Sequence, residues 1–373
     1  MLALLCLPET PPAPGERRGQ RRPPASSMGT MERSLLAAGI VERDETNDVL
    51  GVWSYPGVDA ATEQVAIARS CLASAGSEDE GAYPTRTVVS RYGGQYVYQC
   101  TRNAGECKEL AKVTHFSVYV IAKDFHPELF MELARVFAAA YAKAGDPVHV
   151  LQAFLSVFAR GAVGSYNAAE YDIQQSMVAA PLKQNIALFG ESFILLWVAM
   201  LLKKRIVVYC DEAPRLLEFL RCLPLLVWHR KYFDCLCPFV QLDDAQLEDL
   251  ASQGAYCAGF TDDAVKVRSD LYDVIVDLPA QTLNVNDKAK TDLGMGEFHR
   301  NLGSFLAKAA ANDEAKNTDI VKGMHSKTAQ LFKKLTVLKE AEQLNLEALE
   351  AQQGVSRSFA RFLYNVAVSE NMC

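Results

Sequence analysis

Residues 190–209, GESFILLWVAMLLKKRIVVY, form the stretch around which the rest of the chain is organised. Apolar side chains recur in its first part at steps of three and four residues, which is helical spacing. This stripe consists of Phe193, Leu196, Trp197, Met200 and Leu201. The positions between them are also apolar, so the sequence predicts a helix covered on nearly all sides. The basic residues 203–205 close it, where cations suit the negative end of the helix dipole.

The four residues that follow, IVVY at 206–209, are β-branched and aromatic. Such a run is typical of a central strand in a parallel sheet, where both faces are buried. A helix that passes directly into a buried strand is half of an α/β unit. The stretch therefore predicts an α/β fold for this part of the chain.

The composition limits the class of protein. The chain has 373 residues, of which 50% are hydrophobic and 22% charged, enough for two or three domains with a real core. Its net charge of −7 and its pI near 5.5 give no support to a nucleic-acid partner, because such proteins usually carry a basic field. A basic patch on a protein partner remains compatible with this charge.

The ten cysteines are scattered, and only Cys235 and Cys237 lie close together in the sequence. A C-x-C pair alone is not a zinc spacing. Cys71, Cys210 and Cys257 lie inside apolar runs, where cysteine behaves as a small hydrophobic residue. We expect reduced structural thiols in a cytoplasmic protein.

Residues 1–30 differ in composition from the rest. The segment PETPPAPGERRGQRRPPASS is rich in proline and arginine and nearly devoid of apolar residues, so it cannot offset its own ordering entropy. This composition predicts a disordered extension. Its PPAP and RRPP pieces could be polyproline ligands, although a plain spacer is the favoured interpretation.

Residues 34–160 indicate a small antiparallel sheet with helices. The expected strands are 35–41, 49–55, 87–92, 95–101 and 113–122. Gly93-Gly94 is a strong hairpin turn, and the acidic segment 74–81 predicts a flexible loop. Pro127 and Pro147 suit the first turns of two helices. The second of these helices has the apolar stripe Val150, Leu151, Phe154, Leu155 and Phe158. This order of elements predicts a two-layer α+β lobe.

Residues 161–180 contain glycines and polar residues without a clean period, which indicates a linker. Strand and helix patterns then alternate over residues 181–284, as in a parallel α/β sheet. Residues 225–228 and 235–242 are further strand or irregular apolar segments, and residues 255–260 and 273–278 are expected to form two more buried strands. Residues 285–373 carry helical stripes only. The expected fold class is therefore α/β, with an α+β N-terminal lobe, an α/β C-terminal lobe and a helical C-terminal part.

No motif for covalent chemistry stands out. The sequence has no phosphate loop, no dinucleotide fingerprint around Gly294 and Gly296, and no nucleophile elbow at Gly190–Ser192. The six histidines are dispersed, without a Cys/His cluster at ligand spacing. We therefore assign no catalytic residue, cofactor or metal. His115 lies within a strand and is interpreted as a structural histidine rather than a base.

Three residues are candidates for contact with a partner protein. Trp53 and Tyr55 are two residues apart on an expected strand, so their side chains point to the same face. If that face belongs to the core they are packing residues, which is the favoured interpretation for Trp53; if it faces solvent they form an aromatic patch suited to an interface. His229, between Trp228 and Arg230, is more polar than its surroundings and is the third candidate.

Taken in order, these segments resemble the DENN-domain family. The hairpin LLAAGIVERDETNDVLGVWSYP resembles the opening of the upstream lobe, which in this family is a longin-like module. The segment ILLWVAMLLKKRIVVYC resembles the core helix and strand of the family. The segments LPLLVWHRKYFDCLCPFV, AYCAGFTDD and DLYDVIVDL match the following core segments in order and spacing. The likeness runs from residue 35 to the C-terminus and is to the short, single-module members.

This resemblance implies a guanine nucleotide exchange factor, or regulator, of Rab GTPases, with the GTPase bound across the cleft between two lobes. Such a factor performs no covalent chemistry. It binds the nucleotide-free GTPase better than the GDP-bound form, and by reciprocity it lowers the affinity for GDP by the same factor.

The resemblance to short members leaves a second class open. These members lack the accessory domains of longer relatives, so the fold could instead serve as a non-catalytic docking subunit. Its partners would be coiled-coil subunits of an endosomal recycling (Commander-type) scaffold. In either case we expect a cytoplasmic protein associated with late endosomes. Cys373 is the last residue and forms no prenylation box, so membrane attachment is expected only through partners. A small-molecule enzyme would need a convergent polar pocket, for which the sequence offers nothing.

Overall fold

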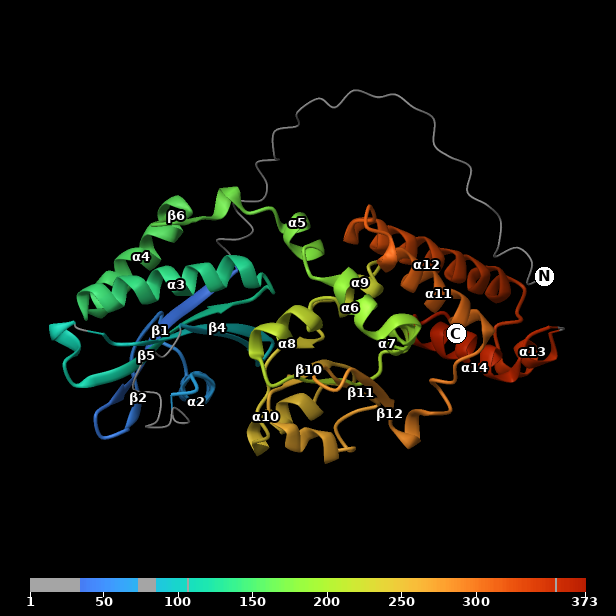
Figure 1. Ribbon diagram of the computed structural model, residues 1–373, viewed down its shortest axis with the longest axis horizontal. Helices are drawn as coiled ribbons and strands as arrows, with labels where there is room; N and C mark the ends of the chain where they lie inside the picture. The colour runs from blue at the N-terminus through green and yellow to red at the C-terminus, as the bar shows by residue number, and fades with distance from the viewer. Residues whose placement is uncertain (1–33, 73–84, 106, 353) are drawn as a thin grey trace, which may run out of the picture.

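The computed structural model describes residues 34–72, 85–105, 107–352 and 354–373. The predictions for residues 1–30 and for the acidic loop 74–81 lie outside these ranges. Figure 1 shows an elongated molecule in which an N-terminal sheet with its helices lies at one end and the last helices of the chain at the other.

The N-terminal lobe contains a five-stranded antiparallel sheet in the order β2-β1-β5-β4-β3. Its strands are β1 (Leu35–Asp44), β2 (Val49–Tyr55), β3 (Arg86–Tyr92), β4 (Gln95–Asn103) and β5 (Val113–Ala122). All five strands predicted from the sequence are thereby confirmed. Gly93 and Gly94 join β3 to β4 with φ angles of 55° and 78°, which glycine adopts without a steric penalty.

Helices cover both faces of this sheet (Figure 1). They are α2 (Ala60–Arg69) on one face and α3 (Pro127–Ala144) and α4 (Pro147–Arg160) on the other. Along β5, Tyr119 and Ile121 pack with the α2 side, whereas Val118 and Val120 join the core under α3. This double burial explains why β5 is apolar at successive positions rather than alternating. Both prolines occupy the first turn of their helices, as predicted.

The segment predicted as a linker has its own local structure. It contains the short hairpin of β6 (Ala162–Val163) and β7 (Tyr166–Asn167), followed by α5 (Ile173–Val178). Tyr166 is buried. The connection is therefore packed on the N-terminal lobe rather than extended through solvent.

The second sheet has the order β12-β11-β8-β10-β9. Its strands are β8 (Ile206–Tyr209), β9 (Leu236–Cys237), β10 (Cys257–Phe260), β11 (Val274–Asp277) and β12 (Thr282–Val285). β8 lies at the centre and pairs in parallel with β10 and β11, which confirms the prediction made from the run IVVY. The edge strand β12 is antiparallel and was not predicted, because its partly exposed, polar sequence gives no strand signal.

The apolar segment 225–228 is not a strand. It overlaps α9 (Leu223–Leu226), a single buried helical turn with Pro224 in its first turn. Proline suits that position because the helix needs no N–H there.

The helix predicted within residues 190–209 is divided into two pieces, and another helix precedes it. α6 (Leu182–Phe189) is followed by the 3₁₀ turn η4 (Gly190–Phe193) and by α7 (Ile194–Leu201). All eight residues of α7 are buried, as its all-round apolar sequence predicted. In the part of the chain that the structure describes, the run Ile173–Leu201 is the one helical stretch long and apolar enough to cross a membrane, but 56% of its apolar window is buried inside the protein.

The carbonyl groups at the end of α7 accept hydrogen bonds from the residues that follow and from a distant side chain. The backbone N–H groups of Lys203 and Lys204 donate to Met200 (3.3 Å) and Ala199 (2.9 Å). The side chain of Arg230 donates to the carbonyls of Met200 (2.7 Å) and Leu201 (2.8 Å). Lys204 and Arg205 turn to carboxylates of the second lobe, Asp292 and Asp273. That the charges of residues 203–205 complement the dipole of α7 stays a prediction.

The remaining helices surround α7 and the second sheet (Figure 1). They are α8 (Ala213–Leu220), α10 (Asp244–Ala251), α11 (Glu297–Ala311), α12 (Asn317–Glu340), α13 (Leu346–Ala351) and α14 (Arg357–Ser369). Trp197 of α7 is fully buried, and its indole N–H donates to Thr328 Oγ1 of α12 at 3.2 Å. Its ring centroid lies 6.0 Å from that of Phe362 in α14. The helical C-terminal part is thus built around α7.

Gly259 in β10 allows the closest approach between the second sheet and its helices. A Cβ atom placed there would lie 2.4 Å from the carbonyl oxygen of Pro238 and 2.7 Å from a methyl group of Leu220. We predict that Gly259→Ala lowers the free energy of unfolding by about 2 kcal/mol, because overpacking forces the backbone apart. Urea denaturation measures this. Gly254→Ala is the matched control, since a Cβ there meets nothing within 4 Å; equal effects of the two substitutions would contradict the prediction.

Candidate interaction surfaces

Trp53 and Tyr55 lie on β2, an edge strand of the first sheet, and both face the α3–α4 side. Trp53 is half-buried and packs against the main core. Tyr55 is 40% exposed, and its ring meets Phe154 of α4 edge-on at 5.5 Å between centroids. The pair therefore shares one face, as the strand periodicity predicted. Trp53 is partly a packing residue, while Tyr55 remains accessible.

Exposed apolar side chains gather around this pair. Of eleven large hydrophobic residues that are exposed in the described ranges, six belong to β2 and α4. They are Leu50, Val52, Tyr55, Val148, Leu155 and Phe158. The rings of Tyr55 and Phe158 both contact Phe154, so these two exposed residues adjoin where the strand meets the helix. We call these six residues the β2–α4 face.

The α4 members of this face were not identified from the sequence. Leu155 and Phe158 were assigned to the inner stripe together with Phe154, but the residues that α4 buries are Val150, Ala153, Phe154 and Val157. The sequence did contain a sign of the exposed apolar residues, which is the width of the apolar arc around α4. A helix with one buried stripe needs about 100° of apolar surface, and α4 is apolar well beyond that.

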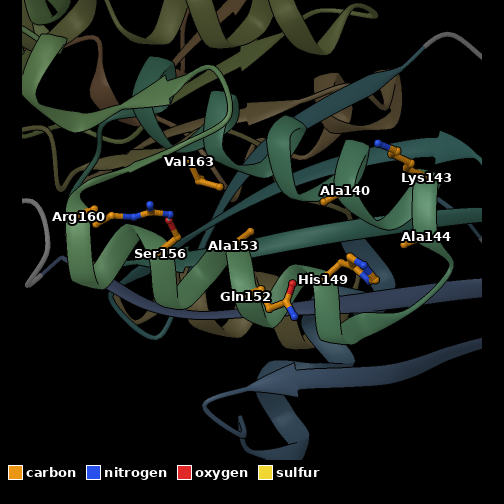
Figure 2. A pocket seen from close by; sticks show the side chains of 9 residues that line it. All are labelled: Ala140, Lys143, Ala144, His149, Gln152, Ala153, Ser156, Arg160 and Val163. Atoms are coloured by element: carbon orange, nitrogen blue, oxygen red, sulfur yellow. The ribbon is translucent and has the colours of Figure 1, made fainter.

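A shallow groove of about 590 Å³ lies beside this face, between α3 and α4. Figure 2 shows the side chains that line it, with small alanines from α3 and basic groups at its edges. Lys143, His149 and Arg160 supply the basic groups, and no carboxylate is among the lining residues that the structure describes. A second open groove, of about 560 Å³, is lined by residues around α13 and α14, including Arg357 and Arg361. Both are open to solvent, unlike the enclosed pockets of small-molecule enzymes.

The two lobes meet along their edge strands β3 and β9, and one hydrophobic core runs through both. At this junction Arg69 of α2 is almost fully buried. Its Nε donates to Gln246 of α10 (3.2 Å) and its Nη1 to the carbonyl of Arg91 (2.7 Å). Burial lowers the pKa of Arg69 to about 10, so the guanidinium is still charged at neutral pH.

Other directional contacts cross the same junction. Arg91 donates to Gln253 Oε1 (2.7 Å), and the hydroxyl of Tyr96 donates to the carbonyl of Phe233 (3.0 Å). On the helical side, Arg221 forms an ion pair with Glu128 of α3. Because these contacts are short and spread along the junction, the orientation of one lobe against the other is fixed. A partner that binds across it meets a preformed surface.

His229 lies in an intramolecular cluster. Its Nε2 is 3.3 Å from Glu370 Oε1 of the C-terminal segment, and its ring meets Phe332 of α12 edge-on at 4.8 Å. Arg230 pairs with the same carboxylate. The structure thus shows a role for His229 in holding α12 and the C-terminal segment together, while its contact with a partner stays a prediction.

Groups that often perform covalent chemistry are distributed through the core. Burial raises the pKa of Cys100 to about 11 and of Cys222 to about 12, so these thiols are poor nucleophiles. His115 lies opposite Arg43 in the β1–β5 ladder, and burial together with that charge lowers the pKa of its imidazole. Among the described residues, no group of three or more His, Cys, Asp or Glu side chains could hold a metal ion.

Comparison with known proteins agrees with this architecture. Residues 179–287, which contain α7 and the second sheet, match the family described as "SPA: Stabilization of polarity axis". Over nearly its whole described length, from the first sheet to the last helices, the chain also aligns with curated proteins of one kind. Because these alignments reach 36% identity over nine-tenths of the chain, it belongs to the DENN-domain family.

The relatives share one name, DENN domain-containing protein 10. The protein from Danio rerio is 36% identical over 346 residues, which cover 91% of this chain and 97% of that protein. The protein from Dictyostelium discoideum is 32% identical over 359 residues (89% and 96%). The human protein is 32% identical over 349 residues (91% and 96%). The family resemblance seen in the sequence is thereby confirmed.

Glu370 gives a prediction on the pH dependence of stability. Burial acts to raise its pKa, but the hydrogen bonds from His229 and Arg230 and their charges outweigh burial and lower the pKa to about 2. A carboxyl with a lowered pKa stabilises the fold above its unfolded value, near 4.3, and loses this contribution as the pH falls toward 2. We predict that Glu370→Gln costs about 1–2 kcal/mol at pH 7, after allowance for solvent screening, and less at pH 3. Urea titrations at the two pH values measure this. A cost independent of pH would contradict it.

Arg69 gives a prediction on the lobe junction. Arg69→Ala leaves the carbonyl of Arg91 without its guanidinium donor and removes one of the two donors to Gln246 Oε1, the other being the backbone N–H of Gln241. We therefore predict a loss of about 3 kcal/mol of unfolding free energy. Amide hydrogen exchange should quicken in β3 and α10. Arg357→Ala, at an exposed arginine, is the matched control. If both variants are equally stable and exchange alike, Arg69 does not hold the junction.

Proposed function

We propose that this chain regulates Rab GTPases as a guanine nucleotide exchange factor, with the GTPase bound across the lobe junction. Membership of the DENN-domain family supports the class of partner. The observation that carries the proposal for this chain is the stiff junction, in which buried Arg69, the Arg91–Gln253 pair and the Arg221–Glu128 pair fix the two lobes.

Nucleotide exchange requires that the factor bind two forms of the GTPase with different affinity, and no covalent bond is made or broken. A factor that binds the nucleotide-free GTPase more tightly than the GDP-bound form weakens GDP binding by the same ratio. Each tenfold of weakening requires about 1.4 kcal/mol of differential binding. When the two lobes are already ordered, little binding free energy is lost in ordering them. More of the contact energy then contributes to the difference in affinity between the nucleotide-free and the GDP-bound GTPase. Binding alone would in this way let the chain act on a GTPase.

The first test is the release of fluorescent GDP from a panel of purified Rabs, with the full chain and with a chain lacking residues 1–30. We predict acceleration of one or a few Rabs. Arg221→Ala should reduce this acceleration about tenfold or more, because it breaks the ion pair that fixes α3 against the second lobe. Arg135→Ala is the matched control, since its ion pair with Glu132 is exposed and lies within α3. No acceleration across the panel by a folded protein would reject exchange activity.

The β2–α4 face favours a second function, that of a non-catalytic docking subunit. Monomeric proteins rarely expose contiguous apolar patches of this kind unless they bind a partner. The helical component of the face offers an apolar ridge of the type that packs against another amphipathic helix. We propose coiled-coil subunits of an endosomal recycling (Commander-type) scaffold as the partner. Association with late endosomes, and attachment to them through partners, would follow from either function.

This second function has its own test. We predict that Leu155→Ser combined with Phe158→Ser abolishes binding of purified scaffold coiled coils but leaves GDP release unchanged. These exposed residues are preferable to Trp53, whose half-buried ring also stabilises the core. Val267→Ser combined with Val368→Ser, at exposed positions elsewhere, is the control. Retained coiled-coil binding by the α4 variant would reject this face as the docking site.

A further inference from the structure

Residues 228–234 lie at the lobe junction and connect α9 to the edge strand β9. Successive backbone hydrogen bonds turn this segment tightly. The N–H of Lys231 donates to the carbonyl of Trp228 (3.3 Å), and the N–H of Phe233 donates to the carbonyl of Lys231 (3.1 Å). The second of these bonds spans three residues, as in a γ-turn, and Tyr232 is the central residue of that turn. We call residues 228–234 the junction loop.

Groups from both lobes hold the junction loop in place. From the first lobe, the hydroxyl of Tyr96 donates to the carbonyl of Phe233 at 3.0 Å. The rings of Phe125 and Phe233 stack with their centroids 6.2 Å apart. Within the second lobe, the thiol of Cys235 donates to the carbonyl of Tyr232 at 3.1 Å. The backbone at Tyr232 and directly after it is therefore fixed.

Lys231, directly before Tyr232, has a backbone conformation that side chains seldom adopt. Its φ angle is 47°, in the left-handed region that favours glycine. Its ammonium group lies over the ring of Trp228, 5.8 Å from the centroid. Such a conformation costs free energy and persists where the surrounding structure imposes it, often next to a bound ligand. The strained position thus adjoins an exposed aromatic residue at the lobe junction.

Tyr232 is 40% exposed, although its neighbour Phe233 is buried. Of the eleven exposed large hydrophobic residues in the described ranges, it is the one that belongs to the junction. Its hydroxyl has no hydrogen-bond partner among the described residues, whereas the hydroxyls of Tyr96 and Tyr256 each donate to a backbone carbonyl. Burial of part of the ring raises the pKa of Tyr232, so the hydroxyl keeps its proton at neutral pH. Both the ring and a hydrogen-bond donor are available to a partner.

The surroundings of Tyr232 suit an interface anchor. Lys231 and Asp234 are exposed on either side of it, and the charge of Arg91 in β3 also acts on its hydroxyl. Aromatic residues with a polar tip are enriched among the side chains that contribute most to binding, and the rim around them is usually polar. Because the loop is already ordered, little conformational entropy is lost when a partner covers it.

We propose that Tyr232 anchors the GTPase at the lobe junction. Its ring enters an apolar hollow on the GTPase, and its hydroxyl donates to an acceptor in that hollow. The inference rests on the proposed function, because it assigns a contact to the same partner. It makes Tyr232 a binding residue, which acts on exchange through the affinity of the GTPase for the junction.

The test measures release of fluorescent GDP from the panel of purified Rabs with three variants of the full chain. Tyr232→Ala should lower kcat/KM for release about thirtyfold, as expected for a central aromatic anchor. Tyr232→Phe keeps the ring but loses the donor, so we expect a loss of about fivefold. Met295→Ala is the matched control, because Met295 is 37% exposed in the loop before α11, and it should act like the unmodified chain.

Circular dichroism on the variants ensures that folded proteins are compared, and Tyr232→Phe keeps the test valid if the alanine variant unfolds. Suppose that the unmodified chain accelerates release. Full activity of either Tyr232 variant, or an equal loss in Met295→Ala, would then overturn the anchor and leave the proposed function standing. No acceleration by the unmodified chain would reject the proposed function and this contact with it.

Discussion

The burial of α7 is the constraint on which the rest of the structure depends. A helix whose eight residues are all buried must be covered on every side. The second sheet covers it at Met200, which contacts Cys257 of β10, and the C-terminal helices cover it at Trp197. Segments more than 100 residues apart in the sequence are thereby held together, and the C-terminal helices cannot leave without exposing the centre of the core.

The same core continues into the first lobe, so the molecule behaves as one stiff body rather than as two independent lobes. Close-packed interiors transmit strain and resist deformation. Two candidate surfaces are arranged on this body: the lobe junction and the β2–α4 face near one end (Figure 1). In our proposals a GTPase and a coiled-coil scaffold occupy different surfaces, so they need not compete.

Much of the fold could be predicted from the sequence because its signals are local. The five strands of the first sheet, the Gly93-Gly94 turn and the α7–β8 unit all follow from periodicity and turn chemistry. The edge strand β12 and the turn of α9 could not be predicted, since a polar edge strand and a short apolar helix resemble loop and strand respectively. The family resemblance rested on the order of these same local segments.

The candidate surfaces were much less accessible to sequence reasoning. The pairing of Arg69 with Gln246 joins residues 177 apart, and that of Arg230 with Glu370 joins residues 140 apart. The hydrophobic periodicity of these segments gives no indication of such distant partners. His229 stood out as polar among apolar neighbours, but its carboxylate partner lies in the C-terminal segment. Likewise, the outer side of α4 was mistaken for its inner side because both are apolar.

The central claim is that a stiff two-lobed body acts on a GTPase through differential binding. The most direct measurement is calorimetric titration of this chain with one Rab in its nucleotide-free form and in its GDP-bound form. Our account predicts binding of the nucleotide-free form at least about tenfold more tightly, since that ratio is the factor by which GDP affinity falls. Equal affinity for the two forms would contradict the account, whatever the absolute strength of binding.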